Sequence, residues 1–427
     1  MMLKYIKENF FETEEKKTLV SNIFSLVILQ GANYLLPLLT VPYLVRVLGP
    51  EYFGLLAFST ATIMYFMLIT DYGFNLSATQ QVSINRDNIA KINEIFSSVM
   101  MIKISLMLVS FVLMSILVFS FEKFSQHWQV YFVTFGVVVG QVLFPIWLFQ
   151  GMERMKYITY LNIGAKLFFT GCIFIFVKEK SDYLLVPLLT ALGFIVAGIW
   201  SLYIVKKEFS VNFKLQSWER IRFQLINGWH VFFSSLAISM YTISTTFILG
   251  VFAGNTTVGY FAAADKIVQA VKGLYLPVSQ AIYPLIGKKI NEDKAAGLVF
   301  INKVIGAVSF GMFFTSLLLF LLAEPIVNIL LGGQYYQSIL LLKIMAFLPL
   351  IISLGNIFGI QAMLNLGYKK EFTLFVLVAA LVGILTALVL TPLYEAIGVS
   401  IAVLIVELLI TVMLGLFFYW NMRKGTL

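Results

Sequence analysis

Three ionisable side chains lie close together in an apolar stretch, FAAADKIVQAVKG (residues 261–273). Asp265, Gln269 and Lys272 follow the spacing i, i+4, i+7 and therefore share one face of a helix, with Lys266 beside the acid. Two cations and one acid leave a positive surplus, which favours binding of an anion. The alternative is a self-neutralised cluster that only fixes helix packing.

Other ionisable residues also interrupt apolar segments, and there the cations outnumber the acids. The cations are Arg46, Lys103, Lys166, Lys266, Lys272, Lys303 and Lys343, and the acids are Asp71, Asp265, Glu324 and Glu407. A charge inside a bilayer costs from about 2.5 to over 10 kcal/mol, so such groups are expected to face protein or water and to serve a function. Arg46 and Lys303 lie near segment ends, where their charges can also reach the interface.

These groups divide into two sets of candidates. We expect Lys266 and Lys272 to bind an anion, with Lys166, Lys343, Lys103 and Arg46 as supporting charge. We expect Asp265, Glu407 or Asp71 to couple to protons or sodium; Glu407, in mid-segment, is the first candidate for reversible protonation, and structural pairing with a cation is its alternative.

Two apolar segments carry polar faces. Gln30, Asn33, Pro37 and Thr40 are spaced by three, four and three residues, which puts them on one side of a helix. The corresponding segment of the second half holds hydroxyl side chains at Ser234, Ser235, Ser239, Thr242, Ser244, Thr245 and Thr246. These faces either hold a helix bundle together through hydrogen bonds or line a polar cavity.

The elements that carry these residues are membrane spans. The chain is 60% hydrophobic and 12% charged, with a mean hydropathy of +0.92, far outside the range of water-soluble domains. Apolar runs long enough to cross a bilayer as helices follow one another with short polar gaps. They predict an all-α polytopic membrane protein with twelve spans, at 20–45, 53–76, 95–120, 128–149, 157–177, 183–205, 225–252, 258–287, 297–323, 338–363, 372–393 and 396–421.

The basic residues give the orientation. Most lysines and arginines outside the spans fall on the side that holds both termini, and the opposite side has Lys123, Lys178 and Lys180. This asymmetry predicts cytoplasmic termini and explains the net charge of +9 without nucleic-acid binding.

The two halves of the chain resemble each other. YLVRVLGPEYFGLLAFSTATI (43–63) aligns with FILGVFAGNTTVGYFAAADKIV (247–268), so that Gly49 and Gly54 correspond to Gly254 and Gly259. Six spans in each half make this a parallel repeat. We predict two six-helix lobes around a central cavity: a cytoplasmic segment 1–19, lobes 20–205 and 225–421, a loop 206–224 and a tail 422–427. Thr60 and Ala61 occupy the positions of Asp265 and Lys266 in the first half, so the repeat does not require those charges.

Signatures of catalysis are missing from the sequence. It has no Walker-type Gly-Lys-Ser/Thr motif, no clustered metal ligands and no nucleophile constellation, and Cys172 is its single cysteine. We expect no catalytic residue, no metal and no cofactor apart from a coupling H⁺ or Na⁺.

GANYLLPLLTVPYLVRVLGPEYFGLLAFS (31–59), DYGFNLSATQQVS (71–83) and GYFAAADKI (259–267) resemble the O-antigen and polysaccharide repeat-unit flippases of the multidrug/oligosaccharidyl-lipid/polysaccharide exporter superfamily. The resemblance implies alternating access for an undecaprenyl-diphosphate-linked oligosaccharide, moved from the cytoplasmic to the periplasmic leaflet of the bacterial inner membrane and driven by an ion gradient. It also implies membrane lipid, a polysaccharide polymerase and a chain-length regulator as partners. Relatives often carry an arginine after SAT, where this chain has Gln80 and Gln81.

Three other functions are compatible with this sequence. A multidrug or cation antiporter of the same superfamily would need acids in its cavity, and the cations outnumber them. Flippases of peptidoglycan precursors typically have fourteen spans. The third is a membrane component of polysaccharide assembly that transports nothing itself.

Overall fold

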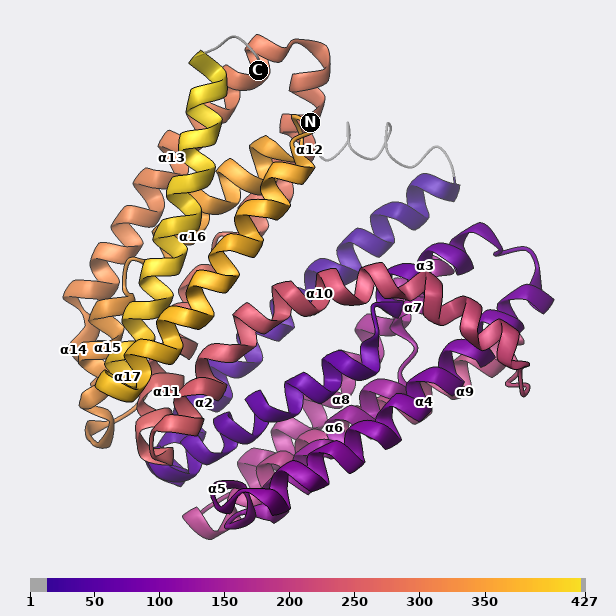
Figure 1. Ribbon diagram of the computed structural model, residues 1–427, viewed down its shortest axis with the longest axis horizontal. Coiled ribbons are helices and arrows are strands. Elements are labelled where there is room, and N and C mark those ends of the chain that lie inside the picture. Colours follow the sequence, from indigo (N-terminus) through magenta and orange to yellow (C-terminus); the bar gives the residue numbers. More distant parts are fainter. Residues whose placement is uncertain (1–13, 424–427) are drawn as a thin grey trace. The chain divides into compact units, whose positions relative to one another are not determined.

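Every described element of the protein is a helix (Figure 1). The computed structural model describes residues 14–423, apart from the side chains of several residues in 14–35 and 234–242 and of residue 423. Most of the expected N-terminal segment 1–19 and the end of the tail 422–427 therefore lie outside the described residues. The all-α class predicted from the sequence is confirmed.

Eight of the helical stretches described are long and apolar enough to cross a membrane. Two of them, Ile28–Ile84 and Lys369–Met422, each contain two of the twelve expected spans. The expected span 225–252 lies in α10 (Trp218–Phe252), and the expected span 258–287 is broken into α11 (Asn255–Gly273) and α12 (Leu276–Glu292). The protein is therefore a multi-pass membrane protein.

The chain forms two packed units, which differ from the expected lobes in one respect. Of the described residues, unit 1 comprises those up to Thr40 and Thr62–Leu236, and unit 2 comprises Val41–Ala61 and those from Ala237 onward. Helix α2 (Glu14–Asp71) thus leaves unit 1, contributes to unit 2 and returns, while α10 begins in unit 1 and ends in unit 2. The predicted lobes meet at the loop 206–224, whereas the units exchange parts of these two helices.

The remaining elements have the following bounds. Unit 1 holds α3 (Phe74–Ile84), α4 (Ile89–Ser120), α5 (Glu122–Ser125), α6 (Trp128–Leu143), α7 (Ile146–Gly151), α8 (Met155–Phe176), η1 (Lys180–Leu184) and α9 (Leu185–Phe209). Unit 2 holds α13 (Lys294–Leu321), α14 (Ala323–Leu330), η2 (Gly333–Tyr335), α15 (Gln337–Met345), α16 (Leu348–Asn356), the π-helix η3 (Ile357–Met363) and α17 (Lys369–Arg423).

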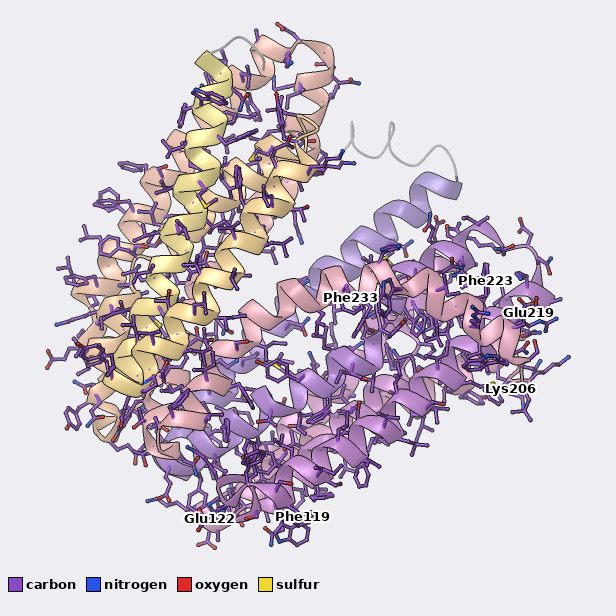
Figure 2. All side chains as sticks on the ribbon, in the orientation of Figure 1. Phe119, Glu122, Lys206, Glu219, Phe223 and Phe233 are labelled. Carbon is purple, nitrogen blue, oxygen red and sulfur yellow. The ribbon has the colours of Figure 1, made fainter. Side chains whose placement is uncertain are left out.

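In unit 1, α9 packs against both α6 and α8, and α3 packs against α7. A buried cluster around Phe96, Trp147 and Phe149 joins α4 to α7. Figure 2 shows Lys206 and Glu219 at one end of these helices and Glu122 at the other, as expected for spans whose charged residues lie at the two membrane surfaces.

In unit 2, α11 packs against α15, α12 against α13, and α16 against both α13 and α17. The first half of the chain contributes its segment 41–61 through a close glycine contact. A Cβ on Gly54 would lie 1.8 Å from the carbonyl oxygen of Asn255 and 2.5 Å from the amide nitrogen of Gly259, and a Cβ on Gly259 would lie 1.9 Å from the carbonyl oxygen of Pro50. Glycines at equivalent positions of the repeat therefore let the two helix starts touch backbone to backbone.

Large apolar side chains are exposed along both units. Phe119 of α4 is 64% exposed, Phe168 of α8 is 66% exposed and Phe310 of α13 is 68% exposed. So much exposed apolar surface would be unfavourable in water, whereas lipid chains solvate it. These faces are the ones expected to contact the bilayer.

Candidate functional site

The charged cluster predicted from the sequence lies on α11, in unit 2. Asp265 is half-buried and accepts a hydrogen bond from the side-chain amide of Gln269, as the spacing of four residues predicts. Lys266 is exposed and Lys272 is half-buried. Asp265 lies within electrostatic reach of both lysines. Among the described residues, however, neither lysine nitrogen comes within 4.0 Å of a carboxylate oxygen.

The position of Lys272 has a second physical basis. It lies in the last turn of α11, where the carbonyl groups that lack helical partners favour a cation by about 0.3–1 kcal/mol. The helix ends there because Pro277 follows in the first turn of α12 and restricts the chain before it. Because α11 ends at Gly273, Lys272 lies at a helix end, and its ammonium group is not held on one face of a continuous helix.

In unit 1, Lys166 lies halfway along α8 and reaches α2. Its ammonium donates to the side-chain oxygen of Asn33 over 2.5 Å. Both residues were chosen from the sequence as binding candidates, and the structure brings them together. Asn33 carries no charge, and no carboxylate of the described residues pairs with Lys166.

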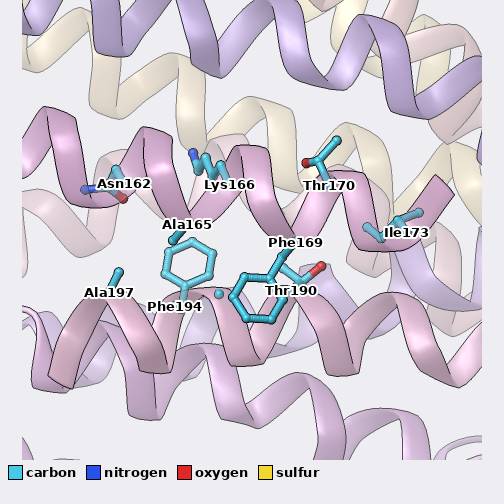
Figure 3. A pocket seen from close by; sticks show the side chains of 10 residues that line it. Asn162, Ala165, Lys166, Phe169, Thr170, Ile173, Thr190, Phe194 and Ala197 are labelled. Carbon is cyan, nitrogen blue, oxygen red and sulfur yellow. The ribbon is translucent and has the colours of Figure 1, made fainter. Parts of the chain in front are cut away.

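A cavity of about 100 Å³ lies beside Lys166, between α8 and α9. Figure 3 shows the rings of Phe169 and Phe194 between the two helices, whereas Lys166, which also contributes to the lining, projects from the other side of α8 in this view. The lining also includes Ile173, further along α8, and Gly193 of α9. The cavity is thus a mostly apolar slot, and the polar side chains of Asn162, Thr170 and Thr190 and the cation Lys166 also contribute to its lining.

Lys103 and Asp71 form a buried ion pair in unit 1. The ammonium of Lys103 lies 3.7 Å from a carboxylate oxygen of Asp71, and the exposed fractions of the two side chains are 2% and 19%. The same oxygen of Asp71 accepts a hydrogen bond of 2.8 Å from Asn75. The structure therefore places Lys103 with a predicted ion-coupling acid, whereas the sequence grouped it with the anion-binding cations.

Arg46 has a structural contact at one end of unit 2. Its guanidinium donates to the carbonyl oxygen of Ile329, in the last turn of α14, and the side chain of Gln334 donates to the carbonyl oxygen of Val45 over 3.0 Å. Arg46 thus satisfies a free carbonyl group at a helix C-terminus, a position that favours a cation.

The remaining candidate residues lie at other positions along the chain. Lys343 is half-buried in the last turn of α15, Glu407 is half-buried on α17, and Gln30 is exposed on α2. Of the hydroxyl face expected in α10, the side chains of Ser234, Ser235, Ser239 and Thr242 lie outside the described residues.

Sequence reasoning missed two polar clusters. The amides of Gln81 and Gln224 donate to each other, each over 2.8 Å, and join α3 to α10. Gln361, in the π-helix, donates to the hydroxyl of Ser279 over 2.8 Å, and that hydroxyl donates to Asn356. The one sequence signal for the first cluster is Gln81, which stands where relatives often have arginine. No sequence signal indicates the second cluster.

Residues 19–290 match the protein family described as "Polysaccharide biosynthesis protein". This chain belongs to that family. It is 39% identical over 404 residues to a protein of Escherichia coli (strain K12) named "Putative O-antigen transporter", covering 94% of this chain and 97% of the relative. A protein of the same name from Shigella dysenteriae is 32% identical, covering 91% of this chain and 97% of that relative. The resemblance drawn from residues 31–83 and 259–267 is thereby confirmed.

This family member also has the fold of two kinds of solved transporter. One structure, a lipid II flippase MurJ in an inward closed conformation, has a TM-score of 0.70 at 15% identity and covers 94% of this chain and 86% of its own. Another, an inward-facing multidrug resistance MATE family transporter of the MOP superfamily, has a TM-score of 0.66 at 13% identity, with coverages of 91% and 95%. At these identities the likeness establishes the fold alone.

The arrangement of charges in this family member is suited to holding an anion. Lys166, Lys266, Lys272 and Lys343 lie in or beside spans, and in the part of the chain described here none of them pairs with an acid. Lys266 is exposed and, like Lys272, lies within electrostatic reach of Asp265, whereas the half-buried Lys166 and Lys343 have no acid partner among the described residues. A half-buried cation without a counter-charge is costly, so a negatively charged ligand would lower the free energy of the protein that binds it. An acid-lined site for cations, as the antiporter alternative needs, is not among the groups described.

Proposed function

We propose that the protein is a flippase that moves an undecaprenyl-diphosphate-linked oligosaccharide from the cytoplasmic to the periplasmic leaflet of the bacterial inner membrane. The product serves the assembly of O-antigen or another surface polysaccharide. Membership of the polysaccharide biosynthesis family, relatives named for O-antigen transport and a fold shared with a lipid II flippase support a transporter and not an enzyme.

The observation that carries the proposal is the set of span lysines without acid partners. A diphosphate brings two or more negative charges to such lysines, and an ammonium group binds phosphate as a point charge. Lys266 and Lys272 are the proposed first contacts, with Lys166 and Lys343 as further cations. Neutral polar groups such as Asn33 and Gln30 would accept the hydroxyls of the sugars.

Coupling to an ion gradient and alternating access are part of the proposal. Asp71, Asp265 and Glu407 are the acids that would exchange H⁺ or Na⁺. Both termini would be cytoplasmic, in line with the lysines and arginines that gather on that side. A polymerase and a chain-length regulator would take over the translocated substrate.

The test is surface polysaccharide display in a strain whose own flippase gene is deleted. Lys266→Gln and Lys272→Gln should abolish display while the protein stays in the membrane at the wild-type amount. Lys303→Gln is the matched control, because Lys303 is an exposed span cation near the expected cytoplasmic end of α13. Full display by both α11 variants would overturn the assignment of the anion site.

A second experiment separates transport from a supporting role. Purified protein in liposomes should move a fluorescent lipid-linked oligosaccharide between leaflets. Absence of movement would favour the alternative of a non-transporting assembly component, and resistance to cationic drugs in a susceptibility screen would favour the antiporter.

A further inference from the structure

The slot between α8 and α9 combines two features that a single ligand can satisfy. Its lining is mostly apolar, with the rings of Phe169 and Phe194 and the side chain of Ile173 (Figure 3), and it also includes Lys166, whose ammonium reaches Asn33 of α2. A ligand that matches both features is an anionic amphiphile whose charged group adjoins a hydrocarbon chain.

The charge of Lys166 is not neutralised within the described part of the protein. Lys166 is half-buried, and its hydrogen-bond partner, the side-chain oxygen of Asn33, carries no charge. An ammonium group has three N–H donors, and Asn33 accepts one of them. Two donors are therefore left for oxygen atoms of a ligand, as a phosphate group would supply.

The size of the slot limits which part of a chain it can hold. A cavity of about 150 Å³ is known to take a benzene ring, so about 100 Å³ fits a five-carbon branched unit but not a long chain. The rest of a chain would leave through the open side, where Leu167 and Phe168 of α8 and Ile199 of α9 are exposed among the faces expected to contact lipid.

We propose that the α8–α9 slot binds the junction of a prenyl diphosphate at a step separate from its first contact with Lys266 and Lys272, with the diphosphate on Lys166 and the first isoprene unit between Phe169 and Phe194. This inference rests on the proposed function and specifies where the lipid carrier of the substrate sits. A flippase must hold the polar head inside the protein while the chain stays in lipid, and a slot whose lining includes a cation allows both. Lys166, about eleven residues along α8 from Met155, lies at roughly half the depth of a span at 1.5 Å per residue.

Photolabelling tests the slot directly. The full-length protein in lipid nanodiscs is illuminated with an undecaprenyl diphosphate that carries a diazirine in its first isoprene unit, and labelled peptides are mapped by mass spectrometry. Label should fall within 162–173 and 190–197. Lys166→Gln should lower labelling about tenfold, as expected for loss of a charge-assisted hydrogen bond. Lys156→Gln, on the same helix at its first turn, is the matched control and should label as the wild type does.

A second variant blocks the slot without touching the charge. Thr190 is exposed and lines the slot, so Thr190→Trp should fill its open side and lower labelling, whereas Ile199→Trp, an equally exposed change on α9 outside the slot, should not. Because Thr190 and Ile199 are both exposed, neither change is expected to prevent folding.

The outcomes separate this proposal from the function on which it rests. Three results would each overturn the proposed slot site. They are label elsewhere in the chain, labelling of Lys166→Gln equal to that of the wild type, and displacement of the probe by phosphatidylglycerol as effectively as by unlabelled undecaprenyl diphosphate. If the liposome experiment shows transport while the slot does not label, the proposed function stands and this inference fails. If the slot is labelled in a protein that does not transport the substrate, this inference stands and the proposed function fails.

Discussion

The buried pair of Lys103 and Asp71 gives the sharpest prediction for stability. At 3.7 Å and an effective dielectric constant of about 20, the two charges attract each other by roughly 4.5 kcal/mol. Lys103→Met leaves the carboxylate of Asp71 without its cation, and removal of one partner of a buried pair costs about 3–5 kcal/mol. We expect that loss in the free energy of unfolding. The double variant Asp71→Asn with Lys103→Met removes both charges and should recover most of it, since replacing a whole buried pair is often close to neutral.

Unfolding in detergent micelles with increasing SDS provides the measurement. Cys172 is the single cysteine of the chain and is half-buried on α8, so a thiol-reactive dye reports its exposure. The matched control is Lys91→Met, which breaks a 2.6 Å pair with Glu94 on the same helix; Lys91 is 40% exposed there, and an exposed pair contributes less than about 1 kcal/mol.

Two results would refute this reasoning. Equal losses in Lys103→Met and Lys91→Met would show that burial does not strengthen the pair, and a double variant as unstable as Lys103→Met would show that packing, not charge, sets the loss. Transport separates structure from coupling: if the double variant is stable but inactive, Asp71 takes part in ion exchange, whereas a stable and active double variant would limit the pair to a structural role.

Three further predictions concern helix contacts. Gly259→Leu should lower the yield of folded protein in membranes severely, because its side chain would collide with the backbone of Pro50; wild-type yield would contradict the contact. Gln224→Leu should cost about 1–3 kcal/mol in the SDS titration by leaving the half-buried amide of Gln81 unpaired, and Leu at both positions should cost less than the single change. Glu395→Gly should stabilise by about 1 kcal/mol, since Glu395 has a φ of 47° and a ψ of −124°; a loss would mean that its hydrogen bond from Thr257 outweighs the strain.

The features that could be predicted from the sequence are those that depend on the spacing of nearby residues. Hydropathy located ten of the twelve expected spans, all except 225–252 and 258–287, because each is long and apolar on its own, and the spacing of four residues placed Gln269 against Asp265. The internal repeat also carried three-dimensional information: Gly54 and Gly259, paired only by alignment, lie in direct contact. The turn between α11 and α12 was not predicted, because apolar residues continue across it.

Contacts across helices were beyond such reasoning. Lys103 was grouped with the anion-binding cations because the sequence gives its charge but not its partner. Asp71 lies on another helix, and the rotation of the two helices decides whether the side chains meet. The same holds for Lys166 and Asn33 and for Gln81 and Gln224, which pair residues more than a hundred positions apart. Packing fixes these pairs, and a single sequence has no period that reports packing between distant helices.

The passage of α2 through both units bears on how such proteins can acquire new substrates. Phe58, from the first half of the chain, packs against Phe247 inside unit 2, with the ring centroids 5.9 Å apart and the rings tilted by 35°. A gene recombined at the loop 206–224 would join unit 2 to a foreign 41–61 segment and place two unrelated surfaces at the glycine contact. Exchange of halves between diverged relatives should therefore fail more often than exchange of single exposed residues, and substrate preference is expected to drift by point substitution instead of by shuffling of halves.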